Sequence, residues 1–215
     1  MRISDRYDLF IFDWDGTIEK VMYMYKLNER LNPFWRSRKR SSFRNAITPD
    51  DSKRIREQLS KLERVEEEDE RRLKRLLDIY MMFTKPKMQE GALAVLKTLH
   101  SRGKTLAVFS NGAMWRIRKE IKALGIEDYF NSMVSAQSMG FLKPNPIGIH
   151  LIMKRCKTPR SRTLYIGDMV DDIKTARSAN VDSCGIAAGF DDYNALDDEK
   201  PTYLFRNMRE FRKAL

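Results

Sequence analysis

The chain has 215 residues, which is enough for one large domain or one domain with an insertion. Of these residues, 42% are hydrophobic and 33% are charged. Its net charge of +11 favours anionic ligands such as phosphates, nucleic acid or anionic lipid. No apolar run approaches the roughly 20 residues of a membrane span, and the N-terminus shows no secretory apolar segment. We therefore expect a soluble cytoplasmic protein, without a membrane partner.

The first predicted element is a short buried strand over 7–12, which runs directly into two carboxylates, Asp13 and Asp15. We expect the chain to bend after the strand and both acids to reach one pocket. Gly16 permits that bend.

Residues 18–85 have a different composition, with 18 Lys and Arg, 12 Asp and Glu, and no glycine. A helix start is predicted at Thr48, and the following apolar residues recur at helical spacing. These residues are Ile55, Leu59, Leu62 and Val65. We expect an inserted all-α domain at 18–85; whether 49–83 forms one helix or two is left open.

Beyond Pro86, short apolar strands alternate with amphipathic helices. This alternation is typical of an α/β fold, a parallel sheet covered by helices on both faces. The expected helices are 89–99, 113–124, 146–156, 171–179 and 207–215. The expected strands are 105–109, 133–135, 163–166, 183–187 and 202–205. The core is therefore predicted to comprise 1–17 and 86–215.

Two cysteines, Cys156 and Cys184, and two histidines, His100 and His150, have no partner at metal-ligand spacing. We expect buried free thiols, as in a reducing compartment, and histidines with structural roles.

Polar residues follow three of the predicted strands at the point where each strand ends. The carboxyl ends of parallel strands lie at one edge of a sheet, where ligands bind. Lys143, in a loop restrained by two prolines, is expected to reach the same edge. The strand-end residues are Asp13, Asp15, Ser110, Asn111, Gly167 and Asp168.

Several carboxylates, a lysine and a hydroxyl at one edge suit phosphoryl transfer. Clustered carboxylates repel one another unless a cation is present, and Mg²⁺ prefers oxygen ligands. A carboxylate can also attack phosphorus and form an aspartyl-phosphate. The lysine and hydroxyl can neutralise the charge on the transferred group.

These residues resemble the four motifs of the haloacid dehalogenase-like hydrolase superfamily, in its order. The motifs span 13–172 and read Asp13-Trp14-Asp15-Gly16-Thr17, Ser110-Asn111, Lys143-Pro144 and Gly167-Asp168 with Asp171-Asp172. The resemblance implies a Rossmann-like core. The insertion at 18–85 resembles the helical cap of the phosphoglycolate-phosphatase-like and β-phosphoglucomutase-like branch.

The resemblance also implies roles for individual residues. Asp13 would be the nucleophile, Asp15 the general acid and base, and Ser110 and Lys143 would stabilise the phosphoryl group. Asp13, the Asp15 carbonyl and Asp168 would bind Mg²⁺, with Asp172 supporting them. The phosphate-binding residues would be Gly16, Thr17 and Asn111, and Asp171 occupies a more variable position.

Asp15 favours one reaction type among those of this superfamily, because its dehalogenases and phosphonatases lack the second acid. The resemblance therefore favours hydrolysis of a small phosphomonoester, such as phosphoglycolate or a sugar phosphate, although a phosphomutase stays open. One departure is Glu19, where many members have an aspartate.

The stretch 32–45, with five basic residues from Arg36 to Arg44, has three possible interpretations. It is a solvated basic loop, a lid for a second anionic group of a small substrate, or a contact for a nucleotide or nucleic acid. The last reading would make the protein a nucleic-acid-end phosphatase or a nucleic-acid-associated protein. The sequence assigns no oligomeric state and no preference for Mg²⁺ over Mn²⁺.

Overall fold

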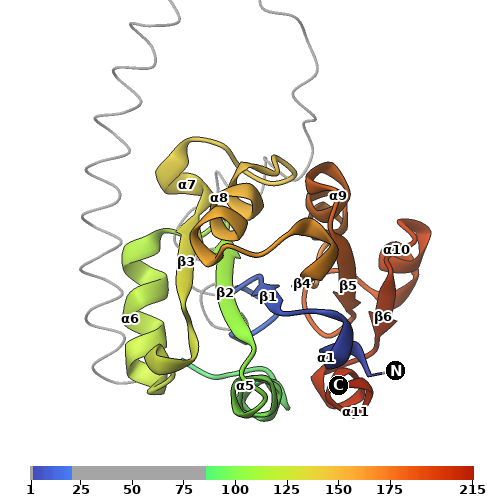
Figure 1. Cartoon of the computed structure of the whole chain (residues 1–215), viewed down its shortest axis with the longest axis horizontal. Coiled ribbons are helices and arrows are strands. Elements are labelled where there is room, and N and C mark those ends of the chain that lie inside the picture. The colour runs from blue at the N-terminus through green and yellow to red at the C-terminus, as the bar shows by residue number, and fades with distance from the viewer. Residues whose placement is uncertain (1, 21–85) are drawn as a thin grey trace, which may run out of the picture. The chain divides into compact units, whose positions relative to one another are not determined.

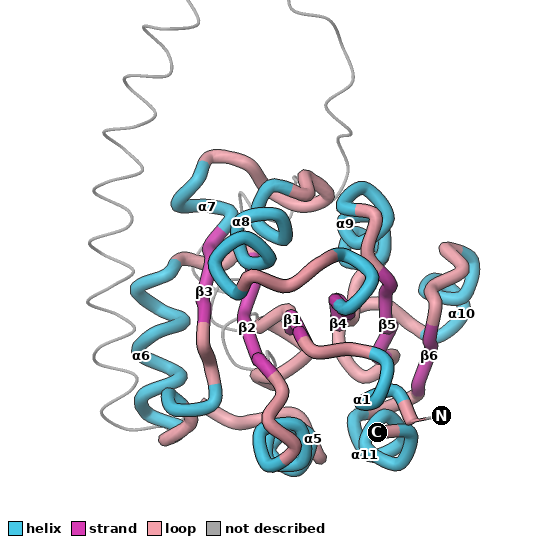
Figure 2. Tube along the Cα trace, viewed as in Figure 1, coloured by secondary structure: helices cyan, strands magenta, loops and turns pink. Residues whose placement is uncertain are grey.

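The computed structural model describes residues 2–20 and 86–215, which belong to one compact unit. Figures 1 and 2 show this unit as a sheet with helices around it. The helices expected within 21–85, the basic stretch 32–45 and the predicted boundaries of the inserted domain lie outside the described residues, so they stay predictions.

The described chain forms a six-stranded sheet in the order β3-β2-β1-β4-β5-β6, and every pairing is parallel. The α/β fold class is therefore confirmed, and the five strands expected after residue 86 are all present. The strands are β1 (Leu9–Phe12), β2 (Thr105–Ser110), β3 (Ser132–Ser135), β4 (Thr163–Gly167), β5 (Asp182–Ile186) and β6 (Tyr203–Phe205).

The five helices expected after residue 86 are also present, with ends shifted by up to three residues. They are α5 (Ala92–Ser101), α6 (Met114–Leu124), α8 (Ile147–Cys156), α9 (Val170–Ala179) and α11 (Met208–Ala214). Figure 1 shows α8 and α9 on one side of the sheet and α5 and α11 on the other. Three shorter helices were not predicted, because four to six residues are too few to show a helical period. They are α1 (Ile3–Arg6), α7 (Ala136–Met139) and α10 (Tyr193–Asp198).

Two hydrophobic cores lie on the two faces of the sheet. Phe10 and Phe12 of β1 pack into the core that includes α5 and α11, whereas Leu9 and Ile11 pack into the core that includes α8. All four side chains are fully buried. A strand covered on both faces needs apolar residues throughout, which explains the uninterrupted run in β1.

The register of the central strands places three strand ends side by side. Phe12 pairs with Val108 of β2 and with Ile166 of β4, so the residues that follow these three lie level at the carboxyl edge. The first of them, Asp13, donates its backbone N–H to the carbonyl of Ile166 at 2.8 Å. The topology therefore brings the polar strand ends together, as expected.

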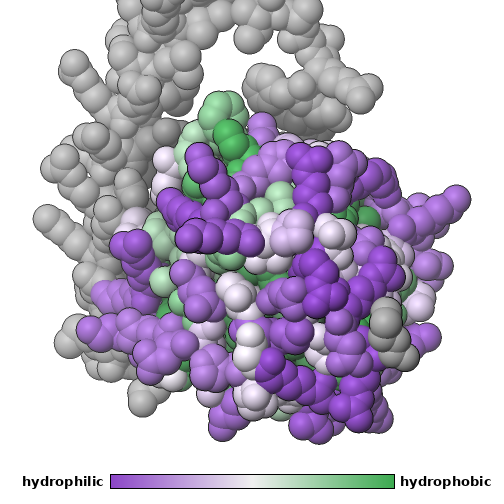
Figure 3. Space-filling model, in the orientation of Figure 1, coloured by the Kyte–Doolittle hydropathy of each residue, from purple (hydrophilic) through white to green (hydrophobic). Residues whose placement is uncertain are grey.

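The surface in Figure 3 is largely hydrophilic. Within residues 2–20 and 86–215, no helix combines the length and the apolar character needed to cross a bilayer. Both cysteines are free, as expected, but only Cys184 is buried. The expected burial of Cys156 is wrong, because its position on α8 leaves it partly exposed.

Candidate active site

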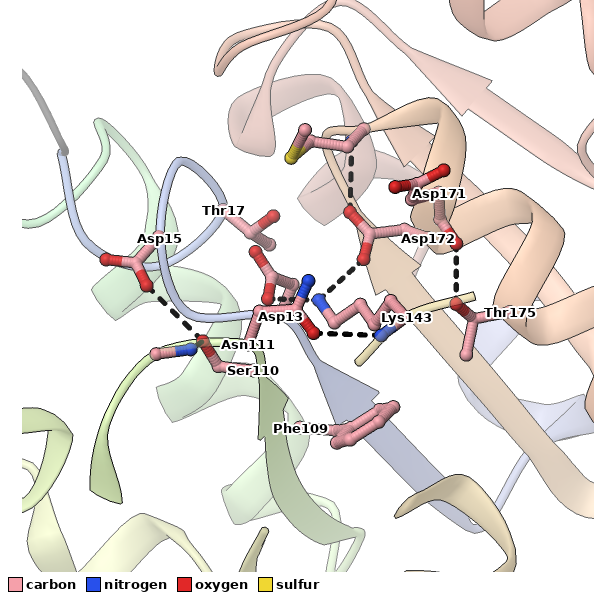
Figure 4. A network of polar contacts seen from close by, with 12 residues as sticks. Asp13, Asp15, Thr17, Phe109, Ser110, Asn111, Lys143, Asp171, Asp172 and Thr175 are labelled. Carbon is pink, nitrogen blue, oxygen red and sulfur yellow. Dashed lines mark hydrogen bonds and ion pairs between the residues drawn. The ribbon is translucent and has the colours of Figure 1, made fainter. Parts of the chain in front are cut away.

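A lysine and two carboxylates form the centre of the candidate site (Figure 4). Asp13 directly follows β1 and is buried. The Lys143 ammonium donates to Oδ1 of Asp13 and, at 2.7 Å, to Oδ1 of Asp172. The loop before α8 delivers Lys143, whose backbone N–H donates to Oδ1 of Asn111 at 3.0 Å. Asn111 therefore ties the lysine loop to the end of β2.

Asp172 lies in the first turn of α9 and has both oxygens engaged. Oδ2 accepts the backbone N–H groups of Asp168 at 3.1 Å and Met169 at 3.0 Å, which caps the helix. Oδ1 accepts the hydroxyl of Tyr165 at 3.0 Å besides the lysine. A Cβ on Gly167 would lie 2.2 Å from the Asp172 carboxyl carbon, so only glycine lets the carboxylate approach β4 this closely.

Asp168 follows β4 and is fully buried. Its Oδ1 accepts the Thr17 hydroxyl at 2.6 Å, and its Oδ2 accepts the Phe190 N–H at 2.8 Å. A Cβ on Gly16 would lie 2.3 Å from Oδ2, and one on Gly189 would lie 1.9 Å from it. Gly16 also has a φ of +89°, which favours glycine. Two glycines thus enclose this carboxylate.

The donor set fits a hard divalent cation. Asp13, Asp168 and Asp172 each offer an oxygen, and these atoms lie within 4.8 Å of one another. Oxygen donors from carboxylates at this density suit Mg²⁺. Since Asp172 is already occupied by two N–H groups, a lysine and a tyrosine, it is better placed to orient the site than to bind the metal directly.

The electrostatics of the centre explain why a cation would be bound. Burial raises the pKa of Asp13 well above its usual range, Lys143 opposes this, and Asp172 and Asp168 reinforce it. Burial and Asp172 raise the pKa of Asp168 to about 7, against the hydrogen bonds from Thr17 and Phe190. Burial alone would lower the pKa of Lys143, but Asp13 and Asp172 raise it above its ordinary value. A divalent cation among these groups would favour the ionised carboxylates.

Asp15 lies apart from this centre, beside the end of β2 (Figure 4). Its Oδ2 accepts the Ser110 hydroxyl at 3.3 Å and the Arg116 guanidinium at 2.5 Å. Arg116 in turn contacts both oxygens of Glu120, one turn further along α6. Glu120 also accepts the indole N–H of Trp14 at 2.7 Å.

Glu19 is a buried carboxylate near this second group of charges. Its Oε2 has no hydrogen-bond partner in the described part of the chain. Burial raises the pKa of Glu19 to about 8, and Glu120 and Asp15 contribute to the rise while Arg116 opposes it. The residue that departs from the usual motif therefore sits within the site region.

The structure brings most of the predicted residues to one edge of the sheet, in two neighbouring groups. Around Lys143 lie Asp13, Asp168, Asp172, Thr17, Gly16 and Asn111, whereas Asp15 lies with Ser110. In Figure 4, Asp171 lies beyond Asp172 as seen from Asp13. The two histidines lie elsewhere: His100 stacks edge-on against Tyr129, and His150 lies in α8.

Sequence reasoning missed four residues of the site. Arg116 and Glu120 could have been found, because an arginine and a glutamate four apart follow the Ser110 loop at pairing distance on a helix. Tyr165 faces the site from inside an apolar strand, and Gln89 donates to the carbonyls of Gly16 and Ala188. Neither has a signal in the sequence.

The profile of the haloacid dehalogenase-like hydrolase family matches residues 10–186. That range contains all four motifs, together with Arg116, Glu120 and Tyr165. The chain belongs to the haloacid dehalogenase-like hydrolases. The resemblance seen in the four motifs is therefore confirmed.

Relatives of this hydrolase include the phosphoglycolate phosphatase of Pseudomonas fluorescens, 26% identical over 119 residues, which are 55% of this chain and 44% of that protein. A crystal structure of a predicted phosphoglycolate phosphatase from Haemophilus somnus covers 96% of this chain and 97% of its own, with a TM-score of 0.68 and 22% identity. A structure assigned as a β-phosphoglucomutase from Thermotoga maritima covers 96% and 97%, with a TM-score of 0.69 and 21% identity.

The matches to curated relatives span about half the length of those proteins. The two solved structures share the Rossmann-like fold with this chain. Because they are less than 25% identical to it, the similarity concerns the fold alone.

Proposed function

We propose that this hydrolase is a Mg²⁺-dependent phosphatase that cleaves a small phosphomonoester through an aspartyl-phosphate. The observation that supports it most directly is the buried centre in which the Lys143 ammonium joins Asp13 to Asp172, with Asp168 within reach. Buried like charges at this density suit a site built to receive phosphate and a cation. Bound Mg²⁺ would neutralise charge on the phosphoryl oxygens.

The residues would act in two chemical steps. First, a carboxylate oxygen of Asp13 attacks phosphorus, the bond to the ester oxygen breaks, and Asp15 gives its proton to that oxygen. Then Asp15 takes a proton from water, whose oxygen attacks phosphorus and breaks the bond to Asp13. Inorganic phosphate and free Asp13 result. Lys143 and Ser110 would hold the phosphoryl oxygens in line.

The proposed substrate is a small phosphorylated metabolite of the phosphoglycolate or sugar phosphate class. The support is the family itself, the relatives of phosphoglycolate phosphatase type and the presence of Asp15. Phosphoglycolate is the first candidate because its carboxylate would add a second anionic group, which a chain of net charge +11 attracts.

The test is phosphate release from phosphoglycolate, sugar phosphates, nucleotides and an aryl phosphate, with Mg²⁺ and with EDTA. We expect turnover by the wild type and its loss in EDTA. Asp13→Asn should lower kcat by at least about 10³-fold, since the nucleophile is removed. Asp198→Asn, which changes an exposed aspartate on α10, is the matched control and should retain activity.

Two results would contradict the proposal. One is a wild type that releases no phosphate from any ester of the panel. The other is release that Asp13→Asn leaves unchanged. If ester is consumed without an equal release of inorganic phosphate, the phosphoryl group is transferred to another hydroxyl, as a phosphomutase would do.

A further inference from the structure

The Asp15 carboxylate is held by one of its oxygens only. Oδ2 accepts both the Arg116 guanidinium at 2.5 Å and the Ser110 hydroxyl at 3.3 Å. Among residues 2–20 and 86–215, these are the hydrogen bonds of the Asp15 side chain, and none goes to Oδ1. One oxygen is therefore anchored while the other is available for a proton.

Arg116 is itself held in a closed ring of contacts. Its Nη1 contacts Oε1 and Oε2 of Glu120 at 3.1 and 2.9 Å, while Nη2 contacts Asp15. Glu120 accepts the indole N–H of Trp14, which is fully buried and packs edge-on against Phe130. Because Trp14 precedes Asp15 in the chain, the ring runs from the peptide through four side chains and back.

Gly112 leaves the space that this ring needs. A Cβ at this position would lie 2.3 Å from Nη2 of Arg116 and 2.9 Å from Oδ2 of Asp15. Both atoms are the ends of side chains, so an alanine would displace the pair rather than the backbone. The glycine after Ser110 and Asn111 thus fits the ion pair closely.

A purely structural role explains this arrangement poorly. Buried ion pairs lose hydration that their attraction only partly restores, so they seldom stabilise a fold more than apolar packing would. Here two carboxylates contact a single guanidinium. A third carboxylate, Glu19, is close enough for the charge of Arg116 to lower its pKa. What the guanidinium does provide is a planar fork that fixes the direction of two carboxylates.

We propose that Arg116 is a positioning residue that holds Asp15 by Oδ2, so that Asp15 exchanges its proton through Oδ1. The proposal rests on the proposed phosphatase function, because it concerns the proton that Asp15 gives to the leaving oxygen. Glu120 and Trp14 keep Arg116 in place, and Gly112 gives it room.

The proposal predicts a dependence on the leaving group. An alkyl oxygen leaves with great difficulty without a proton, whereas p-nitrophenolate leaves without one. Loss of the positioned donor should therefore slow alkyl esters much more than p-nitrophenyl phosphate. The constant to compare is kcat/KM, which covers the steps up to the formation of the aspartyl-phosphate.

The main variant is Arg116→Lys, which keeps the charge but cannot bridge Asp15 and Glu120 with a fork. We expect kcat/KM to fall about 10- to 100-fold for phosphoglycolate or another accepted alkyl phosphate, and by less than about threefold for p-nitrophenyl phosphate. Gly112→Ala should show the same pattern with the arginine intact. Arg118→Lys, on an exposed position of the same helix, is the matched control and should match the wild type.

A double variant separates positioning from a general loss of structure. Asp15→Asn combined with Arg116→Lys should be no slower than Asp15→Asn alone, because both changes remove the same proton transfer. An equal loss on alkyl and p-nitrophenyl esters, or additive losses in the double variant, would overturn the proposal. If the wild type hydrolyses no ester at all, the proposed function fails and this inference fails with it; an active wild type with any of the other results contradicts the inference alone.

Discussion

At the scale of single residues, the site is governed by how many carboxylates are buried. Asp13, Asp168, Asp172 and Glu19 are each less than 4% exposed. Lys143 compensates part of the charge through two ion pairs, but Glu19 has an oxygen without a partner in the described part of the chain. A charged group in such surroundings shifts its pKa and becomes neutral, rather than staying buried as an ion.

We predict that Glu19→Gln changes how stability depends on pH. The pKa of Glu19 is about 8 in the folded protein and near 4.5 when the residue is exposed. The folded state therefore keeps a proton that the unfolded chain loses, so the contribution of Glu19 is full below pH 4.5 and is lost as the pH rises to 8. Removing the charge should raise the free energy of unfolding at pH 8 by on the order of 2–4 kcal/mol, with little change at pH 4.5.

Urea unfolding in EDTA at the two pH values measures this difference. Glu127→Gln, which changes an exposed glutamate, should follow the wild type at both. A Glu19→Gln protein whose stability runs parallel to the wild type across this range would show that Glu19 is ionised in the folded state.

At the scale of the elements, close contacts between helices and strands set the positions of the site residues. Helix α8 crosses β2 where a Cβ on Gly148 would lie 2.1–2.5 Å from three ring carbons of Phe109. The Lys143 ammonium lies 5.6 Å from the centre of the same ring. Phe109 therefore packs against α8 and also lies next to the Lys143 ammonium.

We predict that Gly148→Ala destabilises the protein, although alanine normally favours a helix by about 1 kcal/mol over glycine. The added methyl must displace Phe109 or α8, which costs about 1–3 kcal/mol. By shifting Lys143 it should also lower the proposed phosphatase activity. Urea unfolding measures the loss of stability. Lys154→Ala, at an exposed position of α8, should stay within about 0.5 kcal/mol of the wild type. Unchanged or increased stability of Gly148→Ala would disprove this close contact.

At the scale of the whole molecule, the candidate metal ligands come from segments more than 150 residues apart in the chain. Asp13 follows β1, whereas Asp168 follows β4 and Asp172 lies in the first turn of α9. Only the parallel sheet brings them within 4.8 Å, and unfolding separates them. A ligand that binds the folded state alone stabilises it by mass action.

We predict that Mg²⁺ raises the melting temperature of the wild type, by about 5–10 °C at 100 times its dissociation constant. Asp168→Asn should lose most of this shift, because it removes one of the carboxylates that face the cation. Asp171→Asn is the matched control and should keep the shift. The experiment is a thermal melt of the three proteins with EDTA and with increasing Mg²⁺. An equal shift in Asp168→Asn would exclude Asp168 as a ligand.

Much of the architecture was predictable because it depends on local patterns. The run Leu9–Phe12 is apolar throughout, which predicts a strand covered on both faces, and Gly125 ends α6 at a positive φ, as its place in the sequence indicates. Polar residues directly after three apolar runs then predict a site at the carboxyl edge. Each of these predictions depends only on residues that are close together in the chain, so the sequence is sufficient to make it.

The contacts between distant residues were decided only by the tertiary structure. Nothing near Thr17 in the sequence shows that its hydroxyl donates to Asp168, which lies 151 residues further along the chain. The division of the two motif acids, with Asp13 on Lys143 and Asp15 on Arg116, depends on where α6 and the lysine loop meet the sheet. The sequence determined which chemical groups stand at the strand ends, because strand and helix periods are local; packing decided which group faces which, because that depends on segments about 100 residues or more apart.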